Sequence, residues 1–327
     1  MSTFEALGFL VIGIVLLGIG GEVLVRGATA VARLARLSPA VIGLTVVAMG
    51  TSLPELAVSV AAALRGSPEV AVGNVVGSNI ANITLVVGLT GLLAAIPVSG
   101  KVIRLEWPFM FLSSFLALLL ARDGYLDQLE GGFFLVSLAL FLIYVVRLAR
   151  REVTPAERER YAGEIQQLSR GTQARGVAIN LGLVLFGVGF LVAGAQVMVL
   201  GAIDLAQAAG VSERVIGLTV VAVGTSLPEV AASAVAAYRN QTEMALANAI
   251  GSNIFNVLGI LGVTALLKPV PVAHKIVTID MWWMLALSLL LFPAMRTRHR
   301  VAKKEGAVLL AGYGIYILFL VLTGLGS

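Results

Sequence analysis

A fifteen-residue stretch occurs twice in this chain and constrains its fold more than any other feature. Residues 41–55 read VIGLTVVAMGTSLPE and residues 215–229 read VIGLTVVAVGTSLPE, an offset of 174 residues with one difference. Each copy places a glutamate, Glu55 or Glu229, inside a long apolar run. A charged side chain in a membrane interior costs at least ~2.5 kcal/mol unless a partner compensates it. The repetition of this cost indicates that both carboxylates have a function.

The composition is typical of an integral membrane protein. Of the 327 residues, 58% are hydrophobic and 13% are charged, whereas about 25% of the residues in a soluble domain are charged. The mean hydropathy is +0.97. The absence of cysteine excludes disulfides and thiol chemistry. The net charge of +5 comes from basic residues in short loops, where it indicates membrane orientation rather than nucleic-acid binding.

Ten apolar segments are long enough to cross a bilayer, which takes roughly 20 residues. Four of them carry Gly, Pro, Ser, Thr or Asn near their middles, which predicts broken helices surrounded by protein or by a water-filled cavity. The predicted fold class is therefore an all-α integral membrane protein. The predicted spans are residues 5–25, 39–64, 70–96, 105–121, 131–149, 177–200, 213–238, 244–267, 278–295 and 306–325.

The basic residues predict how these spans are oriented. With the N-terminus outside, eighteen of the 23 Lys and Arg residues fall in inner loops and five fall in outer loops. Because cytoplasmic loops are enriched in Lys and Arg, both termini are predicted to lie outside the cell membrane, which is the inner membrane in a bacterium. The charged segment 151–176 is predicted to be a cytoplasmic linker.

The repeat divides the chain into two halves, residues 1–150 and 177–327. Each half has five predicted spans, and because five is odd, the second half enters the membrane from the opposite side. Two inverted five-helix repeats of this kind are typical of secondary transporters, which bind their substrates near the midplane, between the repeats. The ion-binding segments are predicted at residues 41–82 and 215–256.

Polar residues gather around a proline in each copy. Pro54 has no N–H and clashes with the carbonyl of Gly50, so it breaks the helix and leaves backbone carbonyls without helical partners. The hydroxyl and carboxylate side chains around this break lie three or four residues apart, which puts them on one helix face. The predicted oxygen-bearing site residues are Thr51, Ser52, Glu55, Ser78 and Asn82 in the first copy, and Thr225, Ser226, Glu229, Ser252 and Asn256 in the second.

Brought together by a pseudo-two-fold axis, these residues would form an all-oxygen cage with two carboxylates. Ca²⁺ takes about six to eight oxygen ligands, and no His or Cys is nearby to favour zinc or copper. One Ca²⁺ balances the charge of two carboxylates, but Na⁺ ions or protons could balance it instead. Exclusive occupancy of one site by two kinds of ion is the physical requirement for exchange. The charges alone do not choose between Na⁺ and H⁺.

The paired motifs resemble the α-repeats of the cation/calcium exchanger superfamily, which includes the sodium/calcium exchangers. The matching motifs are GTSLPE at 50–55 and 224–229, and GSNIAN and GSNIFN at 77–82 and 251–256. The resemblance extends over both halves. It implies a prokaryotic ten-helix antiporter that exchanges Ca²⁺ for Na⁺ by alternating access, with no enzymatic activity and no cofactor.

The resemblance also implies roles for individual residues. Glu55 and Glu229 would be the central Ca²⁺ ligands, shared with Na⁺, and Asn82 and Asn256 would lie in the central plane. Some relatives have Asp where this chain has Asn256, so the amide argues against K⁺ co-transport. The other ligands would be the Thr51 and Thr225 carbonyls for Ca²⁺, then Ala48, Thr51, Ser52 and Ser78 for one Na⁺ site, and Ala222, Thr225, Ser226 and Ser252 for its mirror.

Three other functions stay open at this point. An H⁺/Ca²⁺ antiporter would use the same carboxylates, with protons competing for them. A cation channel is a remoter alternative, because broken helices in inverted repeats favour alternating access over a continuous pore. An intramembrane hydrolase would need a base near Ser52 or Ser226, and both histidines lie in predicted loops. The predicted partners are the ions and the lipid bilayer, with no nucleic acid and no obligate protein partner.

Two further polar positions lie within or near the spans. Glu22 could line an access path for ions, and its counterpart at the 174-residue offset is Gln196. Arg65 and Arg239 lie towards the ends of the proline-containing spans, and their side chains are expected to extend to the membrane surface.

Overall fold

The computed structural model describes residues 3–35, 37–64, 69–152, 173–208 and 222–324. The described residues are almost all helical, as predicted. The first half comprises α1 (Thr3–Ala35), α2 (Pro39–Ile42), the π-helical segment η1 (Gly43–Val47), α3 (Ala48–Thr51), α4 (Leu53–Leu64), α5 (Glu69–Ala81), η2 (Asn82–Val86), α6 (Val87–Leu93), β1 (Ile96–Pro97), η3 (Val102–Glu106), α7 (Trp107–Leu120), η4 (Ala121–Asp123), β2 (Tyr125–Leu126) and α8 (Gln128–Glu152).

The second half repeats this order of elements. It comprises α10 (Gln173–Ala208), α12 (Ala222–Thr225), α13 (Leu227–Tyr238), α14 (Thr242–Ile254), η6 (Phe255–Leu261), α15 (Gly262–Leu267), β3 (Val270–Pro271), η7 (Ile276–Asp280), α16 (Met281–Arg296), η8 (Thr297–His299), β4 (Arg300–Val301) and α17 (Lys303–Gly324).

Among the described residues, eight helical stretches are long and apolar enough to cross a membrane. A ninth candidate is the pair Pro39–Thr51 and Leu53–Leu64, whose two parts meet at a bend of 41°. These nine correspond to nine of the ten predicted spans. The tenth, 213–238, begins outside the described residues, and its described part consists of α12 and α13. The predicted all-α membrane fold is confirmed.

Two short strand pairs show how the halves are related. β1 pairs with β4, with Ile96 opposite Val301, and β2 pairs with β3, with Tyr125 opposite Pro271. β3 begins 174 residues after the repeat-related β1 does, at Val270 against Ile96. The two strand pairs are therefore equivalent contacts. Each joins one half of the chain to the other, and the repeat relates one pair to the other. Each pair also joins two loops that are predicted to lie on the same side of the membrane.

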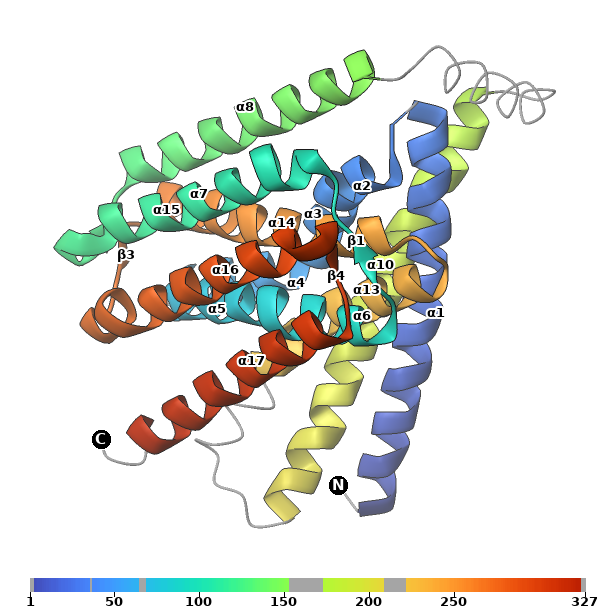
Figure 1. The fold of residues 1–327 in the computed structure, drawn as a ribbon. Helices are drawn as coiled ribbons and strands as arrows, with labels where there is room; N and C mark the ends of the chain where they lie inside the picture. The colour runs from blue at the N-terminus through green and yellow to red at the C-terminus, as the bar shows by residue number, and fades with distance from the viewer. Residues whose placement is uncertain (1–2, 36, 65–68, 153–172, 209–221, 325–327) are drawn as a thin grey trace.

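The ends of the halves lie on opposite sides of the molecule. In Figure 1, the start of α1 and the end of α17 point towards the lower edge. The end of α8 and the start of α10 lie towards the upper edge. This arrangement agrees with an odd number of spans in each half.

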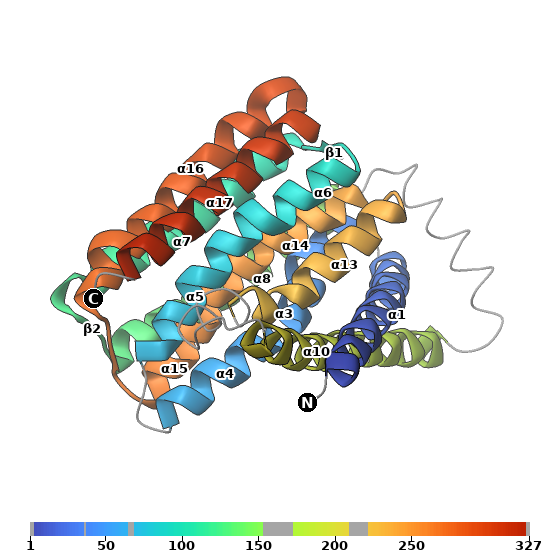
Figure 2. The same ribbon diagram turned by 90° about the horizontal axis from the view of Figure 1, so that it is seen from below.

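α1 and α10 lie side by side and run across the direction of the other long helices (Figure 1). Figure 2 shows this pair away from α16 and α17, which lie at the far edge. A Cβ atom on Gly20 would lie 2.7 Å from the backbone nitrogen of Leu191, and one on Gly187 would lie 2.5 Å from that of Leu24. The backbones of α1 and α10 can therefore approach this closely only because glycine has no side chain. The close-contact glycines recur every seven residues, as Gly13, Gly20 and Gly27 in α1 and Gly187, Gly194 and Gly201 in α10.

The most enclosed spans are the two that carry the GSN motifs. In Val70–Leu93 and Thr242–Leu267, 72% and 78% of the most apolar stretch is buried, against 17–44% in the other six helical spans. Buried asparagines and serines of these two spans therefore lie in the interior of the protein rather than against lipid. The predicted site residues are thus placed on the best-shielded helices and on the two proline breaks beside them.

Candidate functional site

Both repeats are broken at a serine that lies two residues before a proline. α3 ends at Thr51 and α4 begins at Leu53, with Ser52 between them at φ −86° and ψ 6°. Ser226 separates α12 from α13 with almost the same dihedrals, φ −90° and ψ 2°. The proline that follows occupies the first turn of the new helix, where its missing N–H leaves no helical bond unmade. The sequence thus sets two equivalent breaks at matching depths.

The two glutamates lie in the first turns of α4 and α13, directly after these breaks. Glu55 and Glu229 are each 1% exposed. The N-terminal end of a helix carries a partial positive charge, which stabilises a carboxylate there. Thr51, Ser52 and Ser226 are fully buried as well. The side chains that were predicted to share one face of the broken span therefore all point into the protein.

The serines and asparagines of the GSN motifs face the same interior. Ser78 and Ser252 are buried on α5 and α14. Asn82 begins the π-helical segment η2, and Asn256 is the second residue of the π-helical segment η6. π-Helical segments are rare and occur often at functional sites, because they shift side chains out of the regular helical positions.

Side chains from the two halves meet at the breaks. The Ser52 hydroxyl donates a hydrogen bond to Oε1 of Glu229 at 3.2 Å. The Thr51 hydroxyl lies 3.4 Å from Oδ1 of Asn248. These contacts join residues that are 177 and 197 positions apart. The structure thus brings the first copy of the motif against the second, as the predicted symmetry requires.

Most buried polar atoms that lack a hydrogen-bond partner belong to the predicted site. Eleven such side-chain atoms occur in the described part of the chain, and nine of them are on predicted site residues. An unpaired buried polar group costs about 1–3 kcal/mol, so their concentration in one place calls for a ligand. The nine atoms are Oε1 and Oε2 of Glu55, Oε2 of Glu229, Oγ of Ser78, Ser226 and Ser252, Nδ2 and Oδ1 of Asn82, and Oδ1 of Asn256.

These groups fit a hard cation held by many oxygens. Within the described ranges, no three His, Asp or Glu side chains lie close enough to hold a metal ion by themselves. A cation here would therefore need hydroxyl, amide and carbonyl oxygens in addition to the two carboxylates. Ca²⁺ and Na⁺ accept such mixed oxygen shells.

The remaining predicted ligands are Ala48, Thr225 and Ala222. The backbone carbonyl of Ala48 already accepts hydrogen bonds from the Ser52 N–H at 3.1 Å and from the Thr51 hydroxyl at 3.4 Å. Thr225 is half-buried near the end of α12. Ala222 begins α12, and its side chain lies outside the described part of the chain.

Sequence reasoning missed several residues that hold the site. Nδ2 of Asn74 donates to the Ser59 hydroxyl at 3.1 Å, and Nδ2 of Asn248 donates to the Ser233 hydroxyl at 3.3 Å. The two bonds are equivalent, because both partners of the second bond lie 174 residues after the partners of the first. The recurring offset was the signal that could have identified these supporting pairs, since all four residues match across the repeats.

A second acidic pair at the same offset was also missed. Glu106 ends η3 and Asp280 ends η7. Glu106 is 3% exposed, and its Oε2 has no hydrogen-bond partner among the described residues. Oδ1 of Asp280 lies 3.5 Å from the Tyr316 hydroxyl. Each acid is the fifth residue of its candidate span, Val102–Asp123 or Ile276–His299.

A cavity of about 390 Å³ reaches the two breaks from one side. Its wall includes Pro54 and Pro228, which precede the two buried glutamates, and Thr225. α10 supplies the opposite wall with Ala195 and Gln196. The cavity therefore lies between α10 and the two helix breaks. Its lining residues are Leu53, Pro54, Ala57, Val58, Val192, Ala195, Gln196, Val199, Gly224, Thr225 and Pro228.

The repeat-related face of α1 is closed instead. A Cβ atom on Gly21, the counterpart of Ala195, would lie 2.8 Å from Cγ2 of Val235 on α13. Nε of Arg239 donates to Oε2 of Glu22 at 2.8 Å, and the same carboxylate also pairs with Arg26. Arg239 is exposed at the end of α13, and α1 provides a carboxylate partner for it there. Gln196 lines the cavity, whereas Glu22 is held in an ion-paired cluster.

A family comparison decides what kind of protein has this architecture. The model of the sodium/calcium exchanger protein family matches residues 5–148 and matches again at residues 179–322. The chain belongs to the sodium/calcium exchanger family. It is therefore a multi-pass membrane transporter and not an enzyme, as the sequence predicted, and the two matches coincide with the two halves of the fold.

Known proteins of similar sequence match almost the whole chain. It is 33% identical over 316 residues to the inner membrane protein YrbG of Escherichia coli, covering 96% of each chain. It is 32% identical to the sodium/calcium exchanger MaX1 of Methanosarcina acetivorans, covering 95% of this chain and 97% of the relative. A solved structure of the sodium-calcium exchanger NCX_Mj, soaked with 2.5 mM Na⁺ and 10 mM Sr²⁺, superimposes with a TM-score of 0.81 at 32% identity, over 97% of this chain and 99% of that chain.

Proposed function

We propose that the protein exchanges Ca²⁺ for Na⁺ by alternating access at the buried cluster around Glu55 and Glu229. The observation that carries this proposal is the concentration of partnerless buried oxygens on both repeats. Buried polar atoms in proteins are nearly always hydrogen-bonded, and one cation can satisfy several oxygens at once. The name of MaX1 as a sodium/calcium exchanger and the soaking of NCX_Mj with Na⁺ and Sr²⁺ support the same choice of ions.

The two glutamates are the central ligands in this proposal. Their combined charge of −2 matches one Ca²⁺ or two Na⁺, so the two kinds of ion compete for the same carboxylates. The shared ligands explain why binding of one ion would require release of the other. The proposed additional ligands are the hydroxyls of Ser52, Ser78, Ser226 and Ser252, the amides of Asn82 and Asn256, and the backbone carbonyls of Ala48, Thr51, Ala222 and Thr225.

The unequal packing of α1 and α10 supports alternating access. The cavity beside Gln196 gives access on one side, while the contact of Gly21 with Val235 closes the other. Because the repeats are inverted, an exchange of these two arrangements would close the first side and open the second. With the N-terminus outside, as the basic residues predict, the cavity lies in the outer half of the membrane. The site would then face outward.

The proposed organisation follows the same division. Residues 1–150 and 177–327 are the two inverted repeats, with ion-binding segments 41–82 and 215–256. The linker 151–176, most of which lies outside the described residues, would be cytoplasmic. The protein would reside in a cell membrane, and the description of YrbG as an inner membrane protein agrees with that location.

Ion flux in sealed vesicles tests this function. Purified protein is reconstituted, the vesicles are loaded with Na⁺, K⁺ or buffer at a chosen pH, and Ca²⁺ uptake is followed after dilution. Uptake that needs an outward Na⁺ gradient supports the proposal. Uptake driven by a pH gradient alone would identify an H⁺/Ca²⁺ antiporter, and uptake without any counter-ion gradient would identify a channel.

A further inference from the structure

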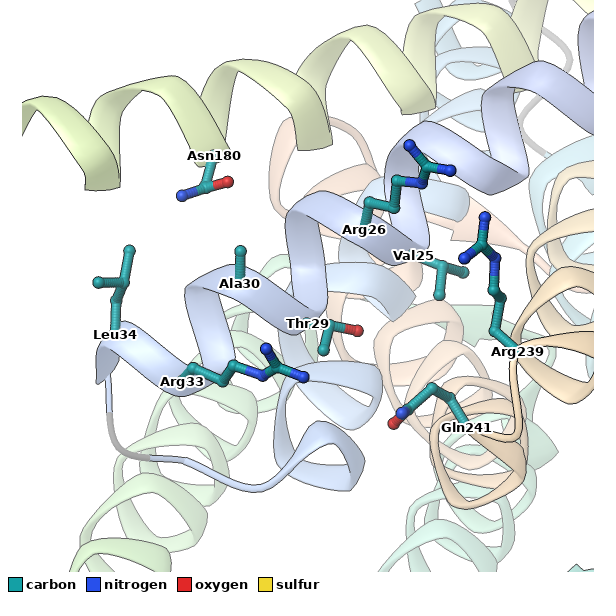
Figure 3. A pocket seen from close by; sticks show the side chains of 9 residues that line it. All are labelled: Val25, Arg26, Thr29, Ala30, Arg33, Leu34, Asn180, Arg239 and Gln241. Carbon is teal, nitrogen blue, oxygen red and sulfur yellow. The ribbon is translucent and has the colours of Figure 1, made fainter. Parts of the chain in front are cut away.

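An ion pair joins α1 to the chain directly after α13, on the side of the molecule that is predicted to be cytoplasmic. Nε of Arg239 donates to Oε2 of Glu22 at 2.8 Å, and Nη2 of the same guanidinium group contacts Oε1. This bidentate arrangement is among the strongest contacts of an arginine with a carboxylate. Figure 3 shows Arg239 after α13 and Arg26 on α1, both lining a cavity of about 400 Å³. The ion pair therefore connects the first repeat to the second.

Only one of the two contacts of Glu22 depends on how α1 packs. Arg26 lies four residues after Glu22 in α1 and pairs with the same carboxylate. That contact is kept wherever α1 lies, because both residues belong to one helix. The contact with Arg239 exists only while α1 lies against α13. A contact shifts a conformational equilibrium only by its difference between the two states, so only the pair with Arg239 can favour one arrangement.

The repeat-related positions cannot form the same ion pair. The counterparts of Glu22 and Arg239 at the 174-residue offset are Gln196 and Arg65. Arg65 directly follows α4 in the sequence, as Arg239 follows α13, although Arg65 itself lies outside the described residues. Gln196 has a neutral side chain, so it could give Arg65 a hydrogen bond but no opposite charge. The repeat therefore keeps the arginine and does not keep its carboxylate partner.

The helices that carry Glu22 and Gln196 also pack differently. α1 covers α13, since a Cβ atom on Gly21 would lie 3.2 Å from the backbone oxygen of Ala231. α10 leaves a cavity over the equivalent part of α4, which includes Ala57, the counterpart of Ala231. The charged partner thus belongs to the helix that is packed, and the neutral one belongs to the helix that leaves a cavity. Charge and packing therefore favour the same arrangement.

We propose that the ion pair between Glu22 and Arg239 keeps the inner side closed and makes the outward-facing arrangement the more populated one in the ion-free protein. This proposal rests on the alternating access proposed above, in which α1 and α10 exchange their packing. In the reverse arrangement, α1 would leave Arg239, and α10 would bring only a neutral amide towards Arg65. The side chains of Glu22 and Arg239 are 29% and 41% exposed. An ion pair with this exposure changes an equilibrium by about fivefold, because water screens it.

Thiol labelling at two equivalent positions measures this equilibrium without measuring transport. Ala57→Cys reports on the side beside α10, and Ala231→Cys reports on the side that α1 covers. The chain has no cysteine, so each reporter carries a single thiol. The full-length protein is reconstituted in vesicles without Na⁺ or Ca²⁺, and a small hydrophilic thiol reagent is supplied on both sides. The labelling rate of Ala231→Cys divided by that of Ala57→Cys then follows the ratio of inward-facing to outward-facing protein.

We expect Glu22→Gln and Arg239→Gln each to raise this ratio of labelling rates by about fivefold. The double variant should raise it no further than either single variant, since both changes remove the same contact. Arg26→Gln is the matched control, because it removes the other partner of the same carboxylate within α1. It should not raise the ratio.

Gln196→Glu tests the proposal while the existing ion pair stays intact. It places a carboxylate at the counterpart of Glu22, so both arrangements would have an ion pair and the ratio should rise. An unchanged ratio in Glu22→Gln and Arg239→Gln, an unchanged ratio in Gln196→Glu, or an equal rise in Arg26→Gln would overturn the proposal. Normal Na⁺-driven Ca²⁺ flux with such a result would contradict the role of the ion pair alone. The expected changes in labelling without any Ca²⁺ flux would support the ion pair and contradict the proposed ions.

Discussion

Asn79 and Asn253 each donate a side-chain hydrogen bond to the backbone carbonyl of the other, at 3.4 Å and 3.2 Å. They occupy the same position in the two repeats, 174 residues apart. Their amides also contact the sulfur atoms of Met284 and Met110, which are related by the same offset. The pseudo-two-fold axis therefore passes between these two asparagines, and it joins the repeats through main-chain groups next to the predicted ion ligands.

The hydrogen bonding of these two asparagines is not fully symmetric, which leads to the first prediction. Oδ1 of Asn79 accepts a hydrogen bond from Asn256 at 3.0 Å, whereas Oδ1 of Asn253 has no partner among the described residues. Asn79→Ala should therefore lower the free energy of unfolding by about 1 kcal/mol more than Asn253→Ala. Denaturant unfolding without Na⁺ or Ca²⁺ measures both. Equal losses would show that the asymmetry has no energetic weight.

The second prediction concerns the two buried carboxylates. Glu55→Gln and Glu229→Gln should each lower Ca²⁺ flux by at least ~100-fold, because one remaining negative charge cannot balance a divalent ion in a low-dielectric site. Both variants should stay folded, since the change removes a costly buried charge. Glu243→Gln, an exposed acid in the first turn of α14, is the matched control and should keep full flux. Wild-type flux from either site variant would contradict the proposed ligands.

The third prediction uses the two break serines as each other's control. The Ser52 hydroxyl donates to Glu229, whereas the Ser226 hydroxyl has no partner in the described residues. Ser52→Ala should destabilise the ion-free protein by about 1.5–3 kcal/mol, the range for a hydrogen bond to a charged group. Ser226→Ala should be close to neutral under the same conditions. Thermal unfolding with a chelator and without Na⁺ gives both values, and equal shifts would argue against the asymmetry.

The features that could be predicted from the sequence are those that depend on residue types at a fixed offset. The broken spans, the burial of Glu55 and Glu229 and the two-repeat architecture all follow from the duplicated motif. The departures from symmetry could not be predicted in this way, because Ser52 and Ser226 are identical residues in nearly identical local sequences. The Ser52 hydroxyl donates to Glu229 and the Ser226 hydroxyl has no partner among the described residues, while α1 packs on α13 and α10 leaves a cavity. None of these long-range contacts has a local signal in the sequence. The same packing explains why Arg239 meets Glu22.

The fourth prediction concerns membrane orientation. Tyr125 lies in β2, which pairs with β3 on the predicted outer side, and Lys304 is the second residue of α17, near the predicted inner side. The chain has no cysteine, so single cysteines at these positions and at position 160 of the linker can be labelled without background. An impermeant thiol reagent should label intact cells at Tyr125→Cys only. Labelling at position 160 or at Lys304→Cys, with Tyr125→Cys protected, would reverse the proposed orientation.

The last prediction concerns Asn256, an amide residue that is predicted to lie in the central plane of the ion site. Nδ2 of Asn256 donates to Oδ1 of Asn79, and Asn256 is fully buried. Asn256→Asp would remove that donor, place two oxygens against each other, and add a third carboxylate to a site that already holds Glu55 and Glu229. Like charges at close range cannot all ionise, so one carboxyl should keep a proton. Ca²⁺ flux through the variant should therefore depend on pH more steeply than wild-type flux.

Na⁺-driven Ca²⁺ flux between about pH 6 and pH 8, with and without K⁺, compares the two forms. The wild type should need no K⁺, because its site has two carboxylates, which one Ca²⁺ balances in charge. Asn256→Gln is the control, since it keeps an amide while changing the length of the side chain. If it alters the pH profile as much as Asn256→Asp does, the added charge is not the cause. A K⁺ requirement in the wild type would show that Asn256 does not lie in the plane of the two glutamates.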